Sequence, residues 1–325
     1  MLRTLIRLAL PLAFALAAAA PAAAQNAFPT KPIRIVLPLP VGTALDVVAR
    51  LVGEQLTGRW GQQVIVENRP GAGGLIAAQA VASAPSDGYT LLGGAASIFT
   101  ILPAQKDKLQ FDVNRAFTPI VMIVGGVPMY VAVSSKLGIA SLPELVDLAR
   151  SKPQQIFVGT NGTGTLPHFA ALALAKMGNI PLTIVPYSTG GTTEAIKDIL
   201  GGRVHVTIEA YSGLAGVLQS GDLKLIAVMS PERTSFFPSV PAAAETVPGL
   251  SAVGWMALAA PTGASEHIVR RLSEGLHYAL RTPNIKQRFE QLGMQAQIMT
   301  PAETRAFIER EQKLWWPIVR EAESK

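Results

Sequence analysis

Four loops rich in glycine, serine and threonine stand where an apolar run gives way to a helical pattern. They cover residues 38–43, 93–97, 159–165 and 186–192. Backbone N–H groups and hydroxyls at a helix N-terminus lie in a partial positive charge and bind anions. A single loop of this kind is more often a plain connection between a strand and a helix. Four together favour a binding site for an anion.

The sequence lacks the usual patterns of a catalytic or metal centre. It contains no cysteine, and its four histidines do not have metal-ligand spacing. No G-x-S-x-G nucleophile elbow is present, and the glycines at 71–74 fail the dinucleotide spacing because residue 76 is isoleucine. We interpret that segment as a turn. We therefore predict a protein that is not an enzyme and that needs no cofactor and no metal.

Two single residues have alternative interpretations. Asp46 falls in the first turn of a predicted helix, where a carboxylate stabilises the helix dipole. We prefer this role for it over catalysis. His168 follows the threonine-rich loop, so it either reaches a ligand or bonds to a loop carbonyl.

The first residues predict export. Arg3 and Arg7 precede an apolar run at 8–20, and small residues follow up to Gln25. This order is typical of a secretory signal peptide, and the apolar run is shorter than the roughly 20 residues of a membrane span. We predict a signal peptide over residues 1–24, cleavage near Ala24–Gln25 and a soluble periplasmic protein, in preference to one held by an N-terminal anchor.

Composition bounds the class of protein. With 49% hydrophobic and 15% charged residues, the chain is typical of a globular protein with a large core. About 300 mature residues suffice for roughly two domains. Without Arg3 and Arg7 there remain 26 basic and 22 acidic residues, a net charge of +4. This mild excess, without a basic run, favours a small anionic ligand over nucleic acid.

Two successive series of strands and helices position the loops. Alternation of short β-branched runs with amphipathic stretches predicts an α/β protein with mostly parallel sheets flanked by helices. We predict one lobe from residues 25–125 plus 253–325 and a second from residues 126–252. The glycines at 125–126 and at 254 would mark the two crossings, which together form a hinge. Helices predicted at 266–281 and 302–323 return to the first lobe.

Several ordered motifs carry a family resemblance. They are PTKPIR at 29–34, PLPVGTALD at 38–46, VIVENRPGAGG at 64–74, DGYTL at 87–91, VPY at 185–187 and LGG at 200–202. On these motifs residues 28–321 resemble the Bug family of extracytoplasmic receptors, the solute-binding components of tripartite tricarboxylate transporters. The resemblance implies a two-lobe, type II-like periplasmic-binding-protein fold. It also implies a monomer that closes on a small carboxylate and delivers it to membrane permease subunits.

The resemblance also assigns ligand contacts. The implied ligand-binding residues are Gly42, Thr43, Ala44, Ala95, Ala96, Ser97, Asn161, Thr163, Gly164, Thr165, His168, Tyr187, Ser188, Thr189, Gly190 and Glu209. We expect the hydroxyls of Thr43 and Thr165 to donate to a ligand carboxylate from opposite lobes. Two alternatives stay open. One is a periplasmic sensor that presents a carboxylate to a signalling partner. The other is a periplasmic hydrolase, which the missing nucleophile elbow disfavours.

Some positions depart from the family pattern. Thr43 replaces a usual glycine, Leu166 and Pro167 replace a polar pair, and Ser188 stands where lysine is frequent. These changes predict a tighter and less polar pocket with one cation fewer. We expect a ligand that differs from the small amino acid or tricarboxylate usual in the family. The candidates are organic acids, among them aromatic acids and other amino acids.

Overall fold

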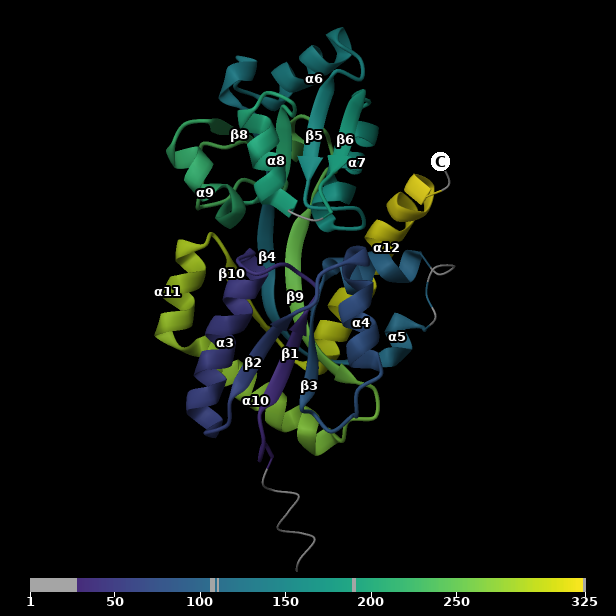
Figure 1. Cartoon of the computed structure of the whole chain (residues 1–325), viewed down its shortest axis with the longest axis vertical. Coiled ribbons are helices and arrows are strands. Elements are labelled where there is room, and N and C mark those ends of the chain that lie inside the picture. Colours follow the sequence, from purple (N-terminus) through teal and green to yellow (C-terminus); the bar gives the residue numbers. More distant parts are fainter. Residues whose placement is uncertain (1–27, 106–108, 110, 189–190, 324–325) are drawn as a thin grey trace, which may run out of the picture.

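The computed structural model describes residues 28–105, 109, 111–188 and 191–323. The predicted signal peptide lies outside the described residues. Two α/β lobes stand one above the other along the long axis, and the strands labelled β4 and β9 run between them (Figure 1). No helix in the described part of the chain combines the length and the apolar character that crossing a membrane requires.

The first lobe begins with two strand–helix units. Its first elements are β1 (Ile33–Leu37), α3 (Ala44–Trp60), β2 (Val64–Asn68), α4 (Leu75–Ala82) and β3 (Thr90–Ala95). Strand β1 pairs in parallel with both β2 and β3. Its consecutive residues Ile35, Val36 and Leu37 are all buried, as expected for a strand covered on both faces. The chain therefore brings the carboxyl ends of these three strands to one edge of the sheet.

Two long strands join the lobes. Strand β4 (Phe117–Ser134) and strand β9 (Val253–Pro261) pair antiparallel with each other, and their register shifts between Val124 and Val127. We predicted a crossing between the lobes at residues 125–126, and β4 is continuous through them. Beside this shift, the side chain of Gln297 in a neighbouring strand occupies the place that a side chain at Gly125 would take. The glycines thus make an irregularity inside one strand.

The second lobe repeats the strand–helix alternation. It contains α6 (Leu142–Ser151), β5 (Ile156–Thr160), α7 (Leu166–Met177), β6 (Leu182–Pro186), α8 (Gly191–Leu200), β7 (Val206–Ala210), α9 (Tyr211–Gln219) and β8 (Leu223–Val228). Strand β5 is parallel to β6 and β7, whereas β4 enters antiparallel beside β7 and β8. Each lobe therefore has a parallel part, as predicted, and the crossing strands add antiparallel pairs.

The C-terminal segment packs on the first lobe. It consists of α10 (Glu266–Arg281), α11 (Pro283–Gln291), β10 (Gln295–Met299) and α12 (Pro301–Glu323), and β10 pairs with β4. The buried clusters place α3, α10 and α11 on one side of the first-lobe sheet and α4, α5 (Val113–Ala116) and α12 on the other. Helix α12 continues to the second lobe, where Glu321 pairs with Lys176 of α7. Both of these side chains are about half exposed, so this ion pair adds little stability.

Candidate ligand-binding site

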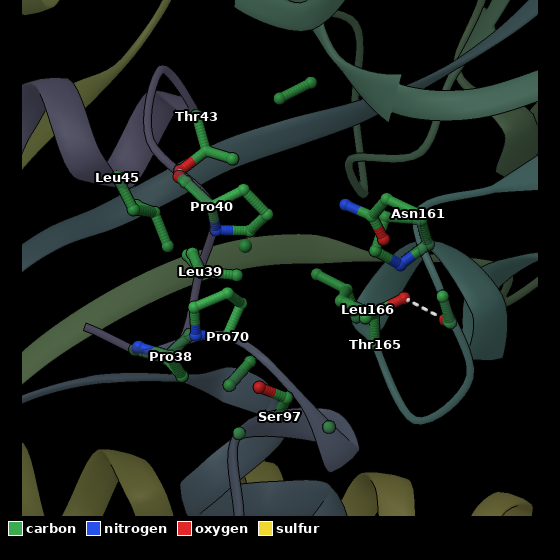
Figure 2. A pocket seen from close by; sticks show the side chains of 18 of the residues that line it. Pro38, Leu39, Pro40, Thr43, Leu45, Pro70, Ser97, Asn161, Thr165 and Leu166 are labelled. Carbon is green, nitrogen blue, oxygen red and sulfur yellow. Dashed lines mark hydrogen bonds between the residues drawn. The ribbon is translucent and has the colours of Figure 1, made fainter. Parts of the chain in front are cut away.

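A cavity of about 230 Å³ lies between the lobes, at the edge where the parallel strands end. Figure 2 shows first-lobe residues such as Thr43, Pro70 and Ser97 facing second-lobe residues such as Asn161 and Leu166. Most of the wall is apolar, with prolines and leucines from both lobes. The crossing strands supply Val127, Met129, Gly254 and Trp255.

The N-terminus of α3 opens into this cavity. Thr43 is the N-cap residue, but its side chain makes no capping hydrogen bond. Its hydroxyl donates instead to the carbonyl oxygen of Pro40, at 3.0 Å. The first N–H groups of α3 therefore lack a side-chain acceptor, and Ala44 and Leu45 line the cavity. An uncapped helix N-terminus of this kind can bind an anion.

A buried carboxylate holds the loop that leads into α3. Asp46 is 1% exposed and accepts hydrogen bonds from Gly42 N at 2.9 Å, Arg50 Nη2 at 2.9 Å and Asn68 Nδ2 at 2.8 Å. Burial raises the pKa of Asp46, but these bonds and the charge of Arg50 outweigh it, so its pKa lies below the usual value. Asp46 thus ties the loop to its own helix and to the end of β2, beyond its predicted role in the first turn.

The corresponding second-lobe loop is closed by its own threonine. Thr165 is the N-cap of α7; its hydroxyl donates to the carbonyl oxygen of Gly162 at 2.8 Å and accepts from His168 N at 3.4 Å. We expected the hydroxyls of Thr43 and Thr165 to donate to a ligand. In the structure both hydroxyls already donate within their own loops, because carbonyl oxygens three residues earlier lie within reach.

His168 and Tyr187 are not among the residues that line the cavity. Burial lowers the pKa of His168, its Nδ1 has no hydrogen-bond partner, and its ring packs edge-on against Phe169. The hydroxyl of Tyr187 donates to Asp198, and burial together with that carboxylate raises the pKa of Tyr187 to about 12. The Tyr187 side chain thus ties its loop to α8.

Glu209, at the end of β7, is the one charged side chain among the described residues that line the cavity. Its Oε2 accepts from Asn161 Nδ2 at 3.1 Å and from the Thr192 hydroxyl, and its Oε1 accepts from Ala210 N at 2.8 Å. Burial raises the pKa of Glu209 more than these three bonds lower it. The second-lobe end of the cavity therefore holds a carboxyl group that belongs to the chain itself.

Two glycines bring the lobes into contact beside the cavity. A Cβ atom on Gly164 would lie 3.2 Å from Cα of Gly73, and one on Gly73 would lie 3.3 Å from the carbonyl oxygen of Gly164. Both glycines have positive φ, 80° for Gly164 and 63° for Gly73. Backbone from each lobe can approach this closely because neither residue has a side chain.

The structure brings together most of the site residues that the sequence suggested. Those that line the cavity are Thr43, Ala44, Ala95, Ala96, Ser97, Asn161, Thr163, Thr165, Ser188 and Glu209. Gly42, Gly164, His168 and Tyr187 are near it but are not part of its lining. Thr189 and Gly190 lie outside the described residues.

Sequence reasoning missed part of the wall. Residues 70–74 line the cavity, although we interpreted residues 71–74 only as a turn. Their position directly after β2, at the carboxyl end of a parallel strand, was the signal that could have revealed them. Met129 and Trp255 were also missed, because an apolar residue in a strand has the same sequence pattern whether it faces a core or a cavity.

Two α/β lobes joined by crossing strands around a cavity define a periplasmic solute-binding protein, and solved structures of that class share the fold. The chain belongs to the tripartite tricarboxylate transporter family of receptors, whose model matches residues 48–323. The resemblance inferred from sequence and the two-lobe α/β class are thereby confirmed, and the chain is a solute-binding protein of this family.

Individual relatives cover nearly the whole chain. The protein BugT of Bordetella pertussis is 32% identical over 313 residues, covering 94% of each sequence. The structure of R. palustris Rpa4515 with adipate has a TM-score of 0.84 at 28% identity and covers 90% of this chain and 97% of its own. MatC (Rpa3494) from Rhodopseudomonas palustris with bound malate has a TM-score of 0.81 at 28% identity, with coverage of 90% and 100%.

Proposed function

We infer that this protein is an exported periplasmic receptor that captures a small organic acid by its carboxylate and delivers it unchanged to membrane permease subunits. The observation that carries this proposal is the uncapped N-terminus of α3, which opens into a cavity lined by both lobes. The adipate and malate in the two solved relatives support a carboxylate ligand. The family's receptor role supports a transporter as the partner.

The ligand's body would be apolar. Leu39, Leu45 and Pro70 of the first lobe face Leu166 of the second across the cavity (Figure 2), and Pro167 also lines it. Apolar surface buried against such walls contributes roughly 25 cal/mol per Å². An alkyl or aryl acid therefore suits this cavity better than a compact polyanion such as a tricarboxylate.

Ligand contacts would come from both lobes. In the first lobe we assign them to the N–H groups of Ala44 and Leu45 and to the hydroxyl of Ser97, and in the second to Asn161 and Glu209. The other lining residues of the predicted set would shape the cavity. A ligand held on both sides stabilises the closed form by its differential affinity for that form.

Closure would turn the lobes about the crossing strands. The proposed first lobe comprises residues 25–125 plus 253–325, the second comprises residues 126–252, and the hinge lies near residues 125–126 and Gly254. The register shift between β4 and β9 lies between Val124 and Val127, next to the proposed hinge, and supports the assignment. Small-angle scattering checks it, since the radius of gyration should fall when ligand saturates the protein. An unchanged radius would contradict closure.

Export follows from the leader. Residues 1–24 would direct secretion and be removed near Ala24–Gln25, in accordance with their charged, apolar and small-residue regions. Amino-terminal sequencing of the periplasmic protein should begin near Gln25. Membrane-bound material that retains Met1 would contradict this part of the proposal.

Thermal-shift screening against a library of organic acids, with neutral sugars and amines as controls, tests the central claim. A ligand at one hundred times its dissociation constant adds about 2.7 kcal/mol to the free energy of unfolding. We expect acids with apolar bodies to raise the melting temperature and to be recovered unchanged by mass spectrometry. Stabilisation by neutral compounds alone, or turnover of a bound acid, would overturn the proposal.

A further inference from the structure

Helices that begin at the cavity wall differ in how their N-terminal N–H groups are used, and this limits how many ligand carboxylates can bind. In α7 the Thr165 side chain caps the N-terminus. In α4 the preceding turn supplies acceptors, since Gly74 N donates to Gly71 O and Leu75 N donates to Ala72 O. These two ends offer a ligand few unused donors.

The N-terminus of α9 is occupied by a carboxyl group of the chain itself. Its N-cap residue, Ala210, has no side-chain acceptor to offer, and Glu209 Oε1 accepts the Ala210 N–H at 2.8 Å. The Glu209 side chain lies against the first turn of α9. A Cβ atom added to Gly213 in that turn would lie only 2.9 Å from Glu209 Cγ. A carboxylate of the protein thus takes the place that a ligand carboxylate would otherwise occupy.

The α3 end differs, and an unused hydroxyl accompanies it in the first lobe. The N-terminal N–H groups of α3 have no side-chain acceptor. Ser97 is 6% exposed, and its hydroxyl has no hydrogen-bond partner among the described residues. It lines the cavity and points into it in Figure 2. A hydroxyl that lines the cavity and is not bonded within the protein can donate to a ligand, so Ser97 is suited to a polar ligand group.

The second-lobe end presents acceptors. Asn161 gives its Nδ2 to Glu209, while its buried Oδ1 accepts no hydrogen bond. No lysine or arginine occurs among the described residues of the lining, so nothing there would neutralise a second ligand carboxylate beside Glu209. Like charges at close range in a poorly solvated site oppose each other.

We propose that the cavity has one anion end, at α3 and Ser97, and one acceptor end, at Glu209 and Asn161. Its ligand is then a monocarboxylate that carries a hydroxyl or ammonium group at its far end. This inference rests on the proposed function and narrows it, since it separates this chain from relatives whose structures hold the dicarboxylates adipate and malate.

Calorimetry on mature wild-type protein with four matched acids tests the inference: hexanoate, 6-hydroxyhexanoate, 6-aminohexanoate and adipate. They share chain length and one carboxylate and differ only at the far end. The four-carbon set of butyrate, 4-hydroxybutyrate, 4-aminobutyrate and succinate repeats the comparison at a shorter reach. In the better-binding set we expect the hydroxy or amino acid to bind at least tenfold more tightly than the dicarboxylate.

The variant Glu209→Gln identifies the residue responsible. It removes the carboxylate with little change of shape, so the preference for the hydroxy or amino acid over the dicarboxylate should fall at least fivefold. The control variant Glu54→Gln, on an exposed face of α3, should leave this preference unchanged. Melting curves show whether each variant is folded. The comparison of the acids on wild-type protein does not depend on either variant. A dicarboxylate that binds wild type as tightly as its hydroxy analogue overturns the inference but leaves carboxylate binding intact. Failure of all eight acids to bind overturns both.

Discussion

The loops at 38–43 and 159–165 occupy equivalent places in the two lobes, and each ends in a threonine at a helix N-cap. Thr43 donates away from its helix, to Pro40 O, so the end of α3 stays open. Thr165 caps α7 and closes its loop on Gly162 O. The same residue type at the same position therefore leaves the helix N-terminus without a side-chain cap in one lobe and caps it in the other. The geometry of each loop decides whether its threonine caps the helix.

The largest effect should come from removing the charge that holds the open loop. Asp46→Asn keeps the shape of the side chain but loses the carboxylate that Gly42, Arg50 and Asn68 bond. We expect a loss of about 2 kcal/mol in the free energy of unfolding at pH 7, because hydrogen bonds to a charged group are worth about 1.5–3 kcal/mol and half-exposed Arg50 is partly screened. Urea denaturation measures the loss, and ligand binding should weaken with it.

The loss caused by Asp46→Asn should also depend on pH. A carboxylate whose folded pKa is lowered stabilises the protein above its ordinary value, about 3.9, and this contribution disappears as pH falls through the folded pKa. The difference between variant and wild type should therefore be largest near neutrality and shrink below pH 4. Exposed Asp147 gives the control variant Asp147→Asn. A difference that does not change with pH would attribute the effect to packing.

The next effect concerns the open end directly. Ala44→Pro removes the first N–H of α3, while proline suits that position and Thr43 already has the extended backbone, φ −67° and ψ 158°, that a following proline requires. Loss of one charge-assisted hydrogen bond should weaken binding about ten- to a hundredfold. Glu266→Pro makes the same change at the start of α10, after Ser265 at φ −64° and ψ 151°, and should not alter affinity. Equal affinities for Ala44→Pro and wild type would place the anion elsewhere.

A smaller effect is expected at the closed loop. Thr165→Ala removes the cap of α7, which should cost about 1 kcal/mol of stability. Affinity should change less than threefold, because the hydroxyl already donates to Gly162 O. Thermal melting and calorimetry on one preparation measure both quantities. A tenfold loss of affinity with little loss of stability would show that Thr165 binds the ligand after all and would remove the contrast between the loops.

The smallest effect tests the contact between the lobes. Gly164→Ala places a methyl group against Gly73 and should weaken binding about threefold, since a ligand that needs the closed form must also overcome this close contact. Gly221→Ala is the matched control. Its φ of 79° equals that of Gly164 within a degree, but nothing lies within 4 Å of the added atom. Equal affinities in the two variants would mean that only backbone strain matters.

Much of the fold could be predicted from the alternation of strands and helices, because runs such as residues 33–37 and helices such as α10 have clear periodicity. Strand β10 could not, since its sequence QAQIM has no β-branched alternation and its pairing depends on β4. In the site, the family resemblance identified ten of the lining residues. The direction of the Thr43 and Thr165 hydroxyls could not be predicted, because it depends on which carbonyl each loop brings near.

Strand β4 is a member of both sheets over its 18 residues, with β9 and β10 beside it in one lobe and β7 and β8 in the other. Amides in an interior strand exchange with deuterium only when the surrounding sheet opens. Because both sheets surround this one strand, opening either sheet removes support from the other. We therefore expect the two lobes to lose exchange protection along β4 together, as one cooperative folding unit.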